Sequence, residues 1–351
     1  MTSSLTRAQP DEASVPPPVP AAPAAGGRTR RLTPTAREYL QVYVPLLCLI
    51  IGLALFTNLH NPHFLTSNNI EQVLTANAVL GILAVGQTLL LVAGQFDLSV
   101  GSMVSFGSVL VAQQITGGTP ETAAIMIVIA VGATTGLAWG LVVSVVGVAP
   151  FILTLGGLAL FASAATTLAH STTIPLPNSL LWLQSGKWLG LPTPIVLWAM
   201  VVLVGALVLH FTRLGRRIYA VGANEEAAFL AGISVTRVKT AVFVLNGLFT
   251  GLAAVVMAGH EGAGDPNSGT NLELTAIAAI VLGGASLAGG RGSMIGSLLG
   301  VLVLTVVTSS LTFLNVPNSY DQFVFGAILI IAVTITATTE LRRRRAKDKR
   351  G

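Results

Sequence analysis

The chain has 351 residues and a formal net charge of +5, and 52% of its residues are hydrophobic while only 9% are charged. An ordinary soluble domain has roughly a quarter of its residues charged, so the composition excludes a soluble enzyme. The single cysteine, Cys48, excludes an internal disulfide bond and a cysteine-rich metal site.

A polar tail is the first element that the sequence predicts. Residues 1–38 are rich in Pro and Ala and lack the apolar stretch that a cleaved signal peptide needs. Such a composition is typical of a disordered segment. We expect a disordered cytoplasmic tail here, then a transmembrane domain over residues 39–340 and a basic cytoplasmic tail at 341–351.

Long charge-free apolar runs fill the predicted membrane domain. A hydrocarbon core about 30 Å thick is crossed by a helix of about 20 apolar residues, and a helix pairs the backbone polar groups that lipid leaves without partners. The predicted fold is therefore all-α, a polytopic membrane protein with about ten transmembrane helices and short broken-helix turns. The expected spans are residues 42–59, 71–93, 98–115, 122–146, 151–169, 194–211, 239–258, 272–287, 294–313 and 321–339.

Basic residues predict the orientation, because cytoplasmic loops carry an excess of Lys and Arg. An even number of spans puts both termini on one side, and the cationic flanks place that side in the cytoplasm. The basic tail at 341–351 is expected to be a solvated flank, with binding to anionic lipid as the alternative. The residues expected on the inner side are Arg213, Arg216, Arg217, Arg237, Lys239 and Arg291, and those expected on the outer side are Lys187, Glu71, Glu121, Glu261, Asp265, Glu273 and Asp321.

A first break, residues 92–102, joins the second and third expected spans. It contains Asp97, and an Asp inside hydrocarbon costs on the order of 3 kcal/mol on insertion scales. One interpretation is structural: Asp97 is the N-cap of the next helix and accepts the amides of Ser99 or Val100. The other is functional: the break lines an aqueous path, as discontinuous helices do in transporters.

A second break, residues 282–293, contains five glycines between 283 and 292. Each glycine costs about 1 kcal/mol relative to Ala in a helix, so no rigid helix is expected there. The tract lacks the Gly-Lys-Ser or Gly-Lys-Thr of a phosphate-binding P-loop, which excludes a nucleotide site of that kind. The five histidines are scattered without a His-x-x-x-His pair, so no metal site is predicted.

Uncharged polar residues inside the expected spans have two interpretations. They hydrogen-bond across helices, or their amides and hydroxyls match a ligand that is rich in hydroxyls and poor in charge. No series of ionisable residues resembles a proton relay, which argues against a proton-driven pump. The candidate residues for a translocation pathway are Asn77, Gln87, Gln95, Phe96, Asp97, Ser99, Asn246, Gly283, Gly284 and Ser286.

The long connection at 212–238 predicts a short helix. Asn224 caps it, Glu225 and Glu226 in its first turn suit the helix dipole, and Gly232 ends it. Its two turns are too short to be stable alone in water. We therefore expect it to rest on the membrane domain, on a partner, or on both, with a plain loop helix as the alternative.

Three segments, residues 97–102, 226–233 and 276–292, resemble in order the permease subunits of ribose-type ATP-binding-cassette (ABC) sugar importers. The resemblance covers about residues 40–340. It implies a bacterial inner-membrane permease that pairs with a second permease, a cytoplasmic ATPase dimer and an external solute-binding protein, with no nucleic acid. It also implies that this chain is not catalytic and binds no cofactor, because ATP and Mg are held by the ATPase. The implied coupling residues are Asn224, Glu225, Glu226, Ala227, Ala228, Phe229, Leu230, Gly232 and Ile233.

The substrate is the most open part of this interpretation. The family usually has Gly-Gly-Ile or Gly-Gly-Leu where this chain has Gly94-Gln95-Phe96, a difference that argues against ribose itself. We expect a neutral sugar or polyol, with a nucleoside or a branched-chain amino acid as the alternative. A self-sufficient secondary transporter, an intramembrane enzyme and a passive scaffold are the competing classes; the first two need intramembrane ionisable groups, for which only Asp97 qualifies.

Overall fold

The computed structural model describes residues 36–176 and 178–317, together with residues 320, 323, 324, 326, 327, 330 and 334. Residues 1–35 of the expected N-terminal tail, most of the tenth span and the basic C-terminal tail therefore lie outside the described residues. The helices are α1 Ala36–His60, α2 Ser67–Ala76, α3 Ala78–Val92, α4 Val100–Thr116, α5 Glu121–Leu141, α6 Pro150–Leu168, α7 Leu181–Gln184, α8 Thr193–Ala206, α9 Arg213–Ala223, α10 Glu225–Leu230, α11 Val235–Glu261, α12 Leu272–Leu282 and α13 Met294–Phe313.

Short elements complete the described fold. Two π-helical turns, η1 Val142–Val146 and η2 Leu207–Phe211, extend α5 and α8. Four two-residue strands form two antiparallel pairs, β1 with β4 and β2 with β3. The strands are β1 Ile174–Pro175, β2 Lys187–Trp188, β3 Leu191–Pro192 and β4 Ala263–Gly264.

The described part of the chain has the helices of an all-α polytopic membrane protein. Six helices are long and apolar enough to cross a membrane, and a seventh span results if α2 and α3, bent by 47°, count as one. The expected number of about ten is not confirmed, because α4 and α12 are shorter than a typical span. The six are Tyr43–His60, Glu121–Val146, Pro150–Leu168, Thr193–Phe211, Val235–Glu261 and Met294–Phe313.

The eighth expected span is the clearest departure from the expected boundaries. Helix α12 ends at Leu282, five residues before the expected end at residue 287. The backbone turns at Gly283 and Gly284, where φ at Gly284 is +91°, a conformation that glycine adopts without steric cost. At about 1.5 Å per residue, the eleven residues of α12 extend only about 16 Å. This length is about half the thickness of a hydrocarbon core.

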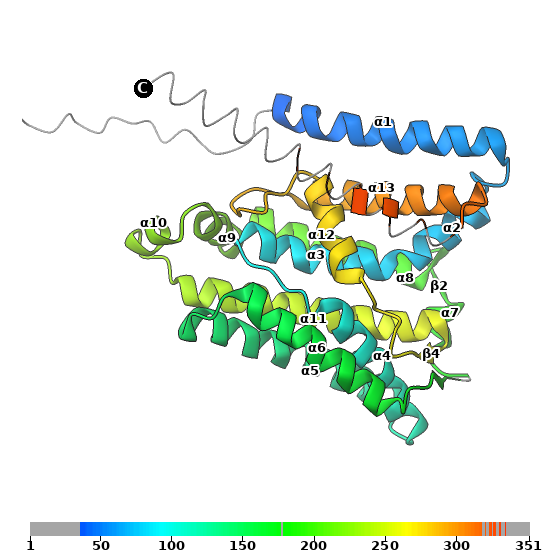
Figure 1. The fold of residues 1–351 in the computed structure, drawn as a ribbon, viewed down its shortest axis with the longest axis horizontal. Coiled ribbons are helices and arrows are strands. Elements are labelled where there is room, and N and C mark those ends of the chain that lie inside the picture. The colour runs from blue at the N-terminus through cyan, green and yellow to red at the C-terminus, as the bar shows by residue number, and fades with distance from the viewer. Residues whose placement is uncertain are drawn as a thin grey trace, which may run out of the picture.

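Helix α3 forms the centre of the fold. All fifteen of its residues are buried, and it packs against α11, α8, α12 and α13. Figure 1 shows α3 between a layer containing α1 and α13 and a layer containing α11, α5 and α6. A helix that is apolar all round is expected in such an interior position.

Glycines set the close contact between α5 and α11. A Cβ on Gly132 of α5 would overlap the carbonyl oxygen of Gly247 of α11, and one on Gly247 would overlap that of Gly132. Gly136, one turn further along α5, meets the carbonyl oxygen of Phe243 in the same way. Because lipid offers no hydrophobic drive between helices, such small residues allow the backbone approach on which membrane packing depends.

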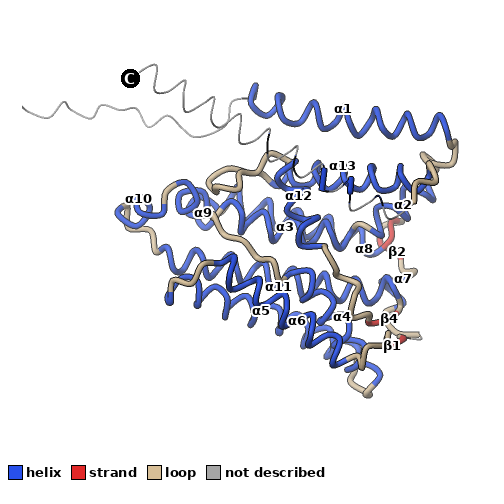
Figure 2. Tube along the Cα trace, in the orientation of Figure 1, coloured by secondary structure: helices blue, strands red, loops and turns tan. Residues whose placement is uncertain are grey.

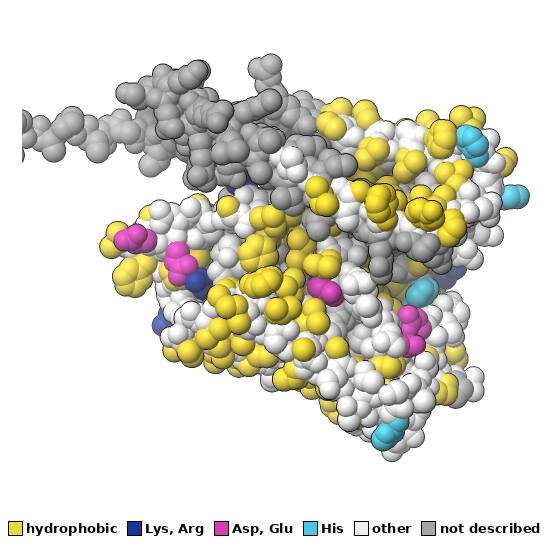
Figure 3. Space-filling view, in the orientation of Figure 1, with side chains coloured by type: hydrophobic (Ala, Val, Ile, Leu, Met, Phe, Trp, Pro, Cys, Tyr) yellow, Lys and Arg dark blue, Asp and Glu magenta, His cyan; other side chains and the backbone are white. Residues whose placement is uncertain are grey.

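Figure 2 shows α7 with the short strands at one end of the bundle and α9 and α10 at the other. At one end, Lys187 pairs with Glu71 at 2.7 Å, and the Trp182 indole donates to Glu121 at 2.7 Å. At the other end, Lys239 pairs with Glu225 at 2.8 Å. Each contact joins residues expected on the same side of the membrane. On the face drawn in Figure 3, hydrophobic side chains cover much of the surface between these ends.

Glu273 differs from the other acidic residues expected in outer connections. It lies in the first turn of α12 and is only 7% exposed. A Cβ on Gly101 of α4 would overlap its carboxylate oxygen, so the side chain rests directly on the α4 backbone. The connection from β4 also packs along α4, where Gly269 N–H donates to the Ser105 hydroxyl at 2.9 Å.

Candidate functional site

Asp97 lies in a buried polar cluster that joins four parts of the chain. The residue is 5% exposed. Its Oδ1 accepts from the Ser99 N–H at 2.9 Å and from the Ser99 hydroxyl at 2.6 Å. Its Oδ2 accepts from Asn246 Nδ2 of α11 at 2.9 Å. Gln87 of α3 donates to the Asp97 carbonyl oxygen at 2.5 Å, and Trp139 of α5 donates to the Ser99 hydroxyl at 3.2 Å. These five residues are the Asp97 cluster.

The start of α4 corrects one prediction and confirms another. The helix begins at Val100 with Ser99 as its N-cap residue, so the prediction that Asp97 is the N-cap is wrong. The reason is that the carboxylate bonds the Ser99 amide in a turn that precedes the helix. The predicted hydrogen bond from that amide is confirmed. The second carboxylate oxygen bonds Asn246 of another helix, so Asp97 also fixes α4 against α11.

Helix α10 has the caps that the sequence predicts. Asn224 Oδ1 accepts from the Ala227 N–H at 2.9 Å. At the other end, Gly232 has φ +79° and donates to the Phe229 carbonyl oxygen, and Ile233 donates to the Ala228 carbonyl oxygen. This pair of hydrogen bonds is the Schellman motif. The six-residue helix is thus closed at both ends by local contacts.

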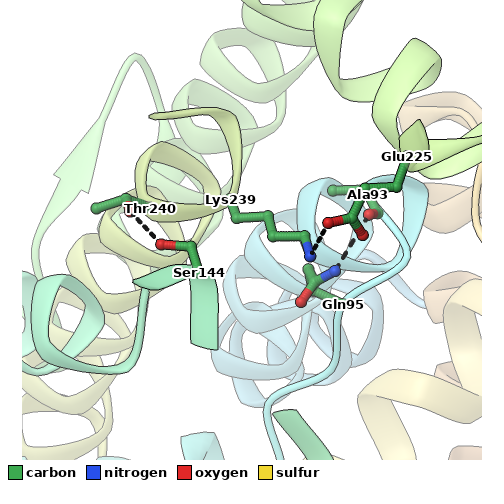
Figure 4. Close-up of polar contacts among 6 residues, drawn as sticks. All are labelled: Ala93, Gln95, Ser144, Glu225, Lys239 and Thr240. Atoms are coloured by element: carbon green, nitrogen blue, oxygen red, sulfur yellow. Dashed lines mark hydrogen bonds and ion pairs between the residues drawn. The ribbon is translucent and has the colours of Figure 1, made fainter. Parts of the chain in front are cut away.

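The two faces of α10 differ in character. Ala228 is buried, and Glu225 is tied to α11 by the pair with Lys239. Phe229 and Leu230, in contrast, are 68% and 78% exposed. Figure 4 shows the Glu225–Lys239 pair and Gln95, which belongs to the α3–α4 connection, at this end of the bundle. An anchored helix therefore presents two adjacent apolar side chains outward.

A backbone contact joins the preceding helix, α9, to both breaks. A Cβ on Gly222 would overlap the Val92 carbonyl oxygen and lie 2.7 Å from the Gly290 nitrogen. The Gly290 N–H donates to the same Val92 oxygen at 2.8 Å. In addition, the Tyr219 hydroxyl of α9 donates to the Gly292 carbonyl oxygen at 2.6 Å. The α9 backbone therefore contacts both breaks directly.

The second break is a compact loop, as its glycines predict. Its Ser286 N–H donates to the Arg291 carbonyl oxygen at 3.0 Å, and the Ser286 hydroxyl accepts from the Ala288 N–H at 3.2 Å. A Cβ on Gly283 would overlap the carbonyl oxygen of Gly296 of α13. The loop therefore packs on α13 and stays closed by its own backbone.

The family profile described as "Branched-chain amino acid transport system / permease component" matches residues 69–333. The chain belongs to this permease family. The match includes α10, both breaks and the Asp97 cluster.

The permease is also similar to curated proteins over most of its length. It is 34% identical to the ribose import permease protein RbsC of Escherichia coli (strain K12), over 85% of this chain and 94% of that protein. It is 36% identical to RbsC of Bacillus subtilis (strain 168), over 84% and 92%. It is 31% identical to the xylose transport system permease protein XylH of Escherichia coli (strain K12), over 86% and 93%. The resemblance to ribose-type ABC permeases is confirmed. No solved structure matches the chain significantly.

The structure brings together only part of the predicted pathway set. Gln87, Asp97, Ser99 and Asn246 belong to one cluster. Asn77 instead lies at the bend between α2 and α3. Gln95 is buried, with its amide 3.5 Å from the Ala93 carbonyl oxygen, and Phe96 is half-buried against the core. Gly283, Gly284 and Ser286 lie in the second break.

Residues that the sequence analysis did not single out complete these contacts in the permease. Trp139 closes the Asp97 cluster, while Gly222 and Tyr219 join α9 to the breaks. Trp139 and Gly222 carry no local signal of a partner, because their partners come from distant parts of the chain. The repeat of Gly132, Gly136 and Gly140 is a visible small-residue pattern that predicts close helix packing.

Proposed function

We propose that the permease is the membrane subunit of a binding-protein-dependent ABC importer that moves a neutral sugar or polyol into the cytoplasm. The observation that carries this proposal is the similarity, over most of both chains, to two ribose import permeases and a xylose transport permease. ATP would be hydrolysed by a separate ATPase dimer, with ATP and Mg bound there. A second permease, identical or related, and an external solute-binding protein complete the proposed assembly in the bacterial inner membrane.

The proposed topology has ten spans with both termini in the cytoplasm. In this arrangement α4 and α12 count as spans, and the segment 321–339 is the tenth. Two ion pairs support this topology, because each joins residues that are expected on the same side of the membrane. They are Lys187 with Glu71 and Lys239 with Glu225. The end that carries α9 and α10 is then the cytoplasmic one, in agreement with its exposed arginines at 213, 216, 217 and 237.

Helix α10 is the proposed coupling helix. Phe229 and Leu230 would insert into a groove of the ATPase, and movement of α10 and α9 would reach both breaks through Gly222. The Asp97 cluster and the second break would shape the translocation pathway. The exposure of an apolar pair on an anchored helix supports the docking role, because a few side chains that become buried in packed pockets carry most of the binding energy of protein interfaces.

Changing Phe229 and Leu230 together to Ser is expected to abolish docking of the ATPase. Both side chains are exposed, so the folded permease should tolerate the change. Copurification of an ATPase from the native membrane should fall at least tenfold, which is about 1.4 kcal/mol of binding free energy. The matched control is Leu189→Ser, which alters a 96% exposed leucine at the other end of the bundle. Equal recovery of the ATPase with the Phe229 and Leu230 variant would refute the coupling role.

The family description favours a second candidate, import of a branched-chain amino acid. The partner binding protein separates the two, because a ligand at about 100 times its Kd stabilises a protein by about 2.7 kcal/mol. We expect the binding protein that copurifies with the permease to show a raised melting temperature with ribose, xylose or another sugar or polyol. If only leucine, isoleucine or valine raises this melting temperature, the proposed substrate class is wrong and the permease imports a branched-chain amino acid.

A further inference from the structure

A cavity of about 280 Å³ lies where α2 bends into α3, opposite the start of α12. Its base is formed by buried apolar residues of α3, α11 and α13, among them Leu80 and Leu304. Its polar lining comes from Asn77, Thr270, Asn271, Thr275 and Thr308. An apolar cavity with a few convergent polar groups is the usual form of a small-molecule site.

The polar lining is rich in hydrogen-bond acceptors. The hydroxyls of Thr270, Thr275 and Thr308 donate to the carbonyl oxygens of Asn267, Asn271 and Leu304, at 2.7, 2.9 and 2.9 Å. A hydroxyl that donates in this way keeps its lone pairs for accepting. One N–H of the Asn77 amide donates to the Val73 carbonyl oxygen at 2.9 Å, and the Asn77 Oδ1 is an acceptor. These side chains therefore suit a ligand that brings hydroxyl donors.

The uncharged lining also favours a neutral ligand. None of the described residues that line the cavity is ionisable. A charged ligand would lose its hydration there without a counter-charge, which is costly. A neutral ligand can place C–H groups on the apolar base and hydroxyls on the threonine oxygens. The volume is slightly below the range for drug-sized ligands, and it therefore suits a molecule of monosaccharide size.

The walls of the cavity are both interrupted elements. On one side, α2 and α3 bend by 47° at Asn77. On the other, α12 begins after Asn271, which has φ +66° and follows a run of turns over residues 266–270. Discontinuous helices form solute sites in transporters, because the free backbone groups at their ends can contact the solute. The cavity lies toward the end of the bundle that contains Lys187 and Glu71, which the proposed topology places outside.

We propose that this cavity binds a neutral polyhydroxylated solute within a single permease protomer, on the outer half of the translocation route. The proposal rests on the proposed function and names a solute site inside it. The permease itself then contributes to selectivity, through acceptor oxygens that recognise hydroxyl donors. Thr275 and Thr308 are the specificity-determining residues.

The test measures equilibrium binding of labelled ribose and xylose to the full-length permease in nanodiscs, without ATPase or binding protein. We expect saturable binding that leucine does not displace. Combining Thr275→Val with Thr308→Val removes two acceptor oxygens at nearly constant volume and should weaken binding at least tenfold. Restoring the hydroxyl with Thr275→Ser and Thr308→Ser should recover most of the affinity.

The matched control is the second cavity of the described structure, of about 670 Å³ between α4 and α6. Ser163→Ala with Thr167→Val removes two hydroxyls from its lining and should leave sugar binding unchanged. The proposal is overturned by absence of saturable binding, or by equal affinity in the Thr275 and Thr308 valine variant and the unmodified protein. Sugar uptake by the complete importer in proteoliposomes tests the proposed function separately. If uptake persists when either of these two binding results is found, the cavity is not a solute site, but the importer assignment still holds.

Discussion

Replacing Gly132 with Ala is expected to lower the stability of the permease by about 3 kcal/mol, the upper part of the range for an overpacked interior. The added methyl group would overlap the Gly247 carbonyl oxygen, and the Gly251 nitrogen lies 3.1 Å from the same position. Backbone atoms of a long helix cannot rotate away as a side chain can. Helices α5 and α11 must therefore separate, which weakens the close packing along their shared glycines.

The matched control for Gly132 is Gly156 of α6, where an added methyl group meets nothing within 4 Å. Gly156→Ala should be neutral or stabilising by up to about 1 kcal/mol, because Ala is the better helix former. Unfolding of both variants in the same detergent, followed by helical circular dichroism, gives the comparison. If Gly132→Ala unfolded together with Gly156→Ala, the close approach of α5 and α11 would be wrong.

A double variant sharpens the same prediction. Gly132 and Gly247 face one another, and each methyl group would overlap the other residue's carbonyl oxygen. Once the helices have separated for one methyl group, the second costs less. Gly132→Ala combined with Gly247→Ala should therefore destabilise the permease by less than the sum of the two single changes, as residues in direct contact do.

Local signals account for the parts of the fold that were predicted well. The caps of α10 depend on residues at most five positions apart, so Asn224 and Gly232 identify the helix in the sequence alone. Apolar length likewise predicts the long helices α5, α6 and α11. The end of α12 was missed by five residues, since an apolar run continues past Gly283 and hydropathy does not distinguish a helix from the turn that follows it.

The contacts of the candidate site were harder to predict, because they depend on distant parts of the chain. Asp97 and Asn246 are 149 residues apart, and Tyr219 and Gly292 are 73 apart. No local sequence pattern indicates which faces of two distant helices pack together. Glu273 shows the same limit: in the sequence it belongs to an outer connection, but the chain folds back along α4 and buries it against Gly101.

Substitutions of Asp97 distinguish a structural role of this residue from a role that depends on its negative charge. Asp97→Ala leaves the Ser99 N–H and the Asn246 amide without their buried acceptor. A hydrogen bond to a charged group contributes about 1.5–3 kcal/mol, and an unsatisfied buried donor costs a comparable amount. We expect Asp97→Ala to lower the free energy of unfolding by about 3 kcal/mol, measured in the same detergent as the glycine variants.

Asp97→Asn is expected to cost much less, about 1 kcal/mol. The new amide oxygen can still accept from Ser99, and its NH₂ can donate to Asn246 if that side chain turns its amide around. Asn246 Oδ1 is buried without a hydrogen-bond partner among the described residues, so the turned amide would gain an acceptor role. Asn246→Ala in the Asp97→Asn background removes this compensating hydrogen bond. The double variant should therefore lose nearly as much stability as Asp97→Ala. Wild-type stability of Asp97→Asn together with loss of sugar uptake would show instead that the negative charge acts in the pathway, because the hydrogen-bonded cluster would be intact and only the charge missing.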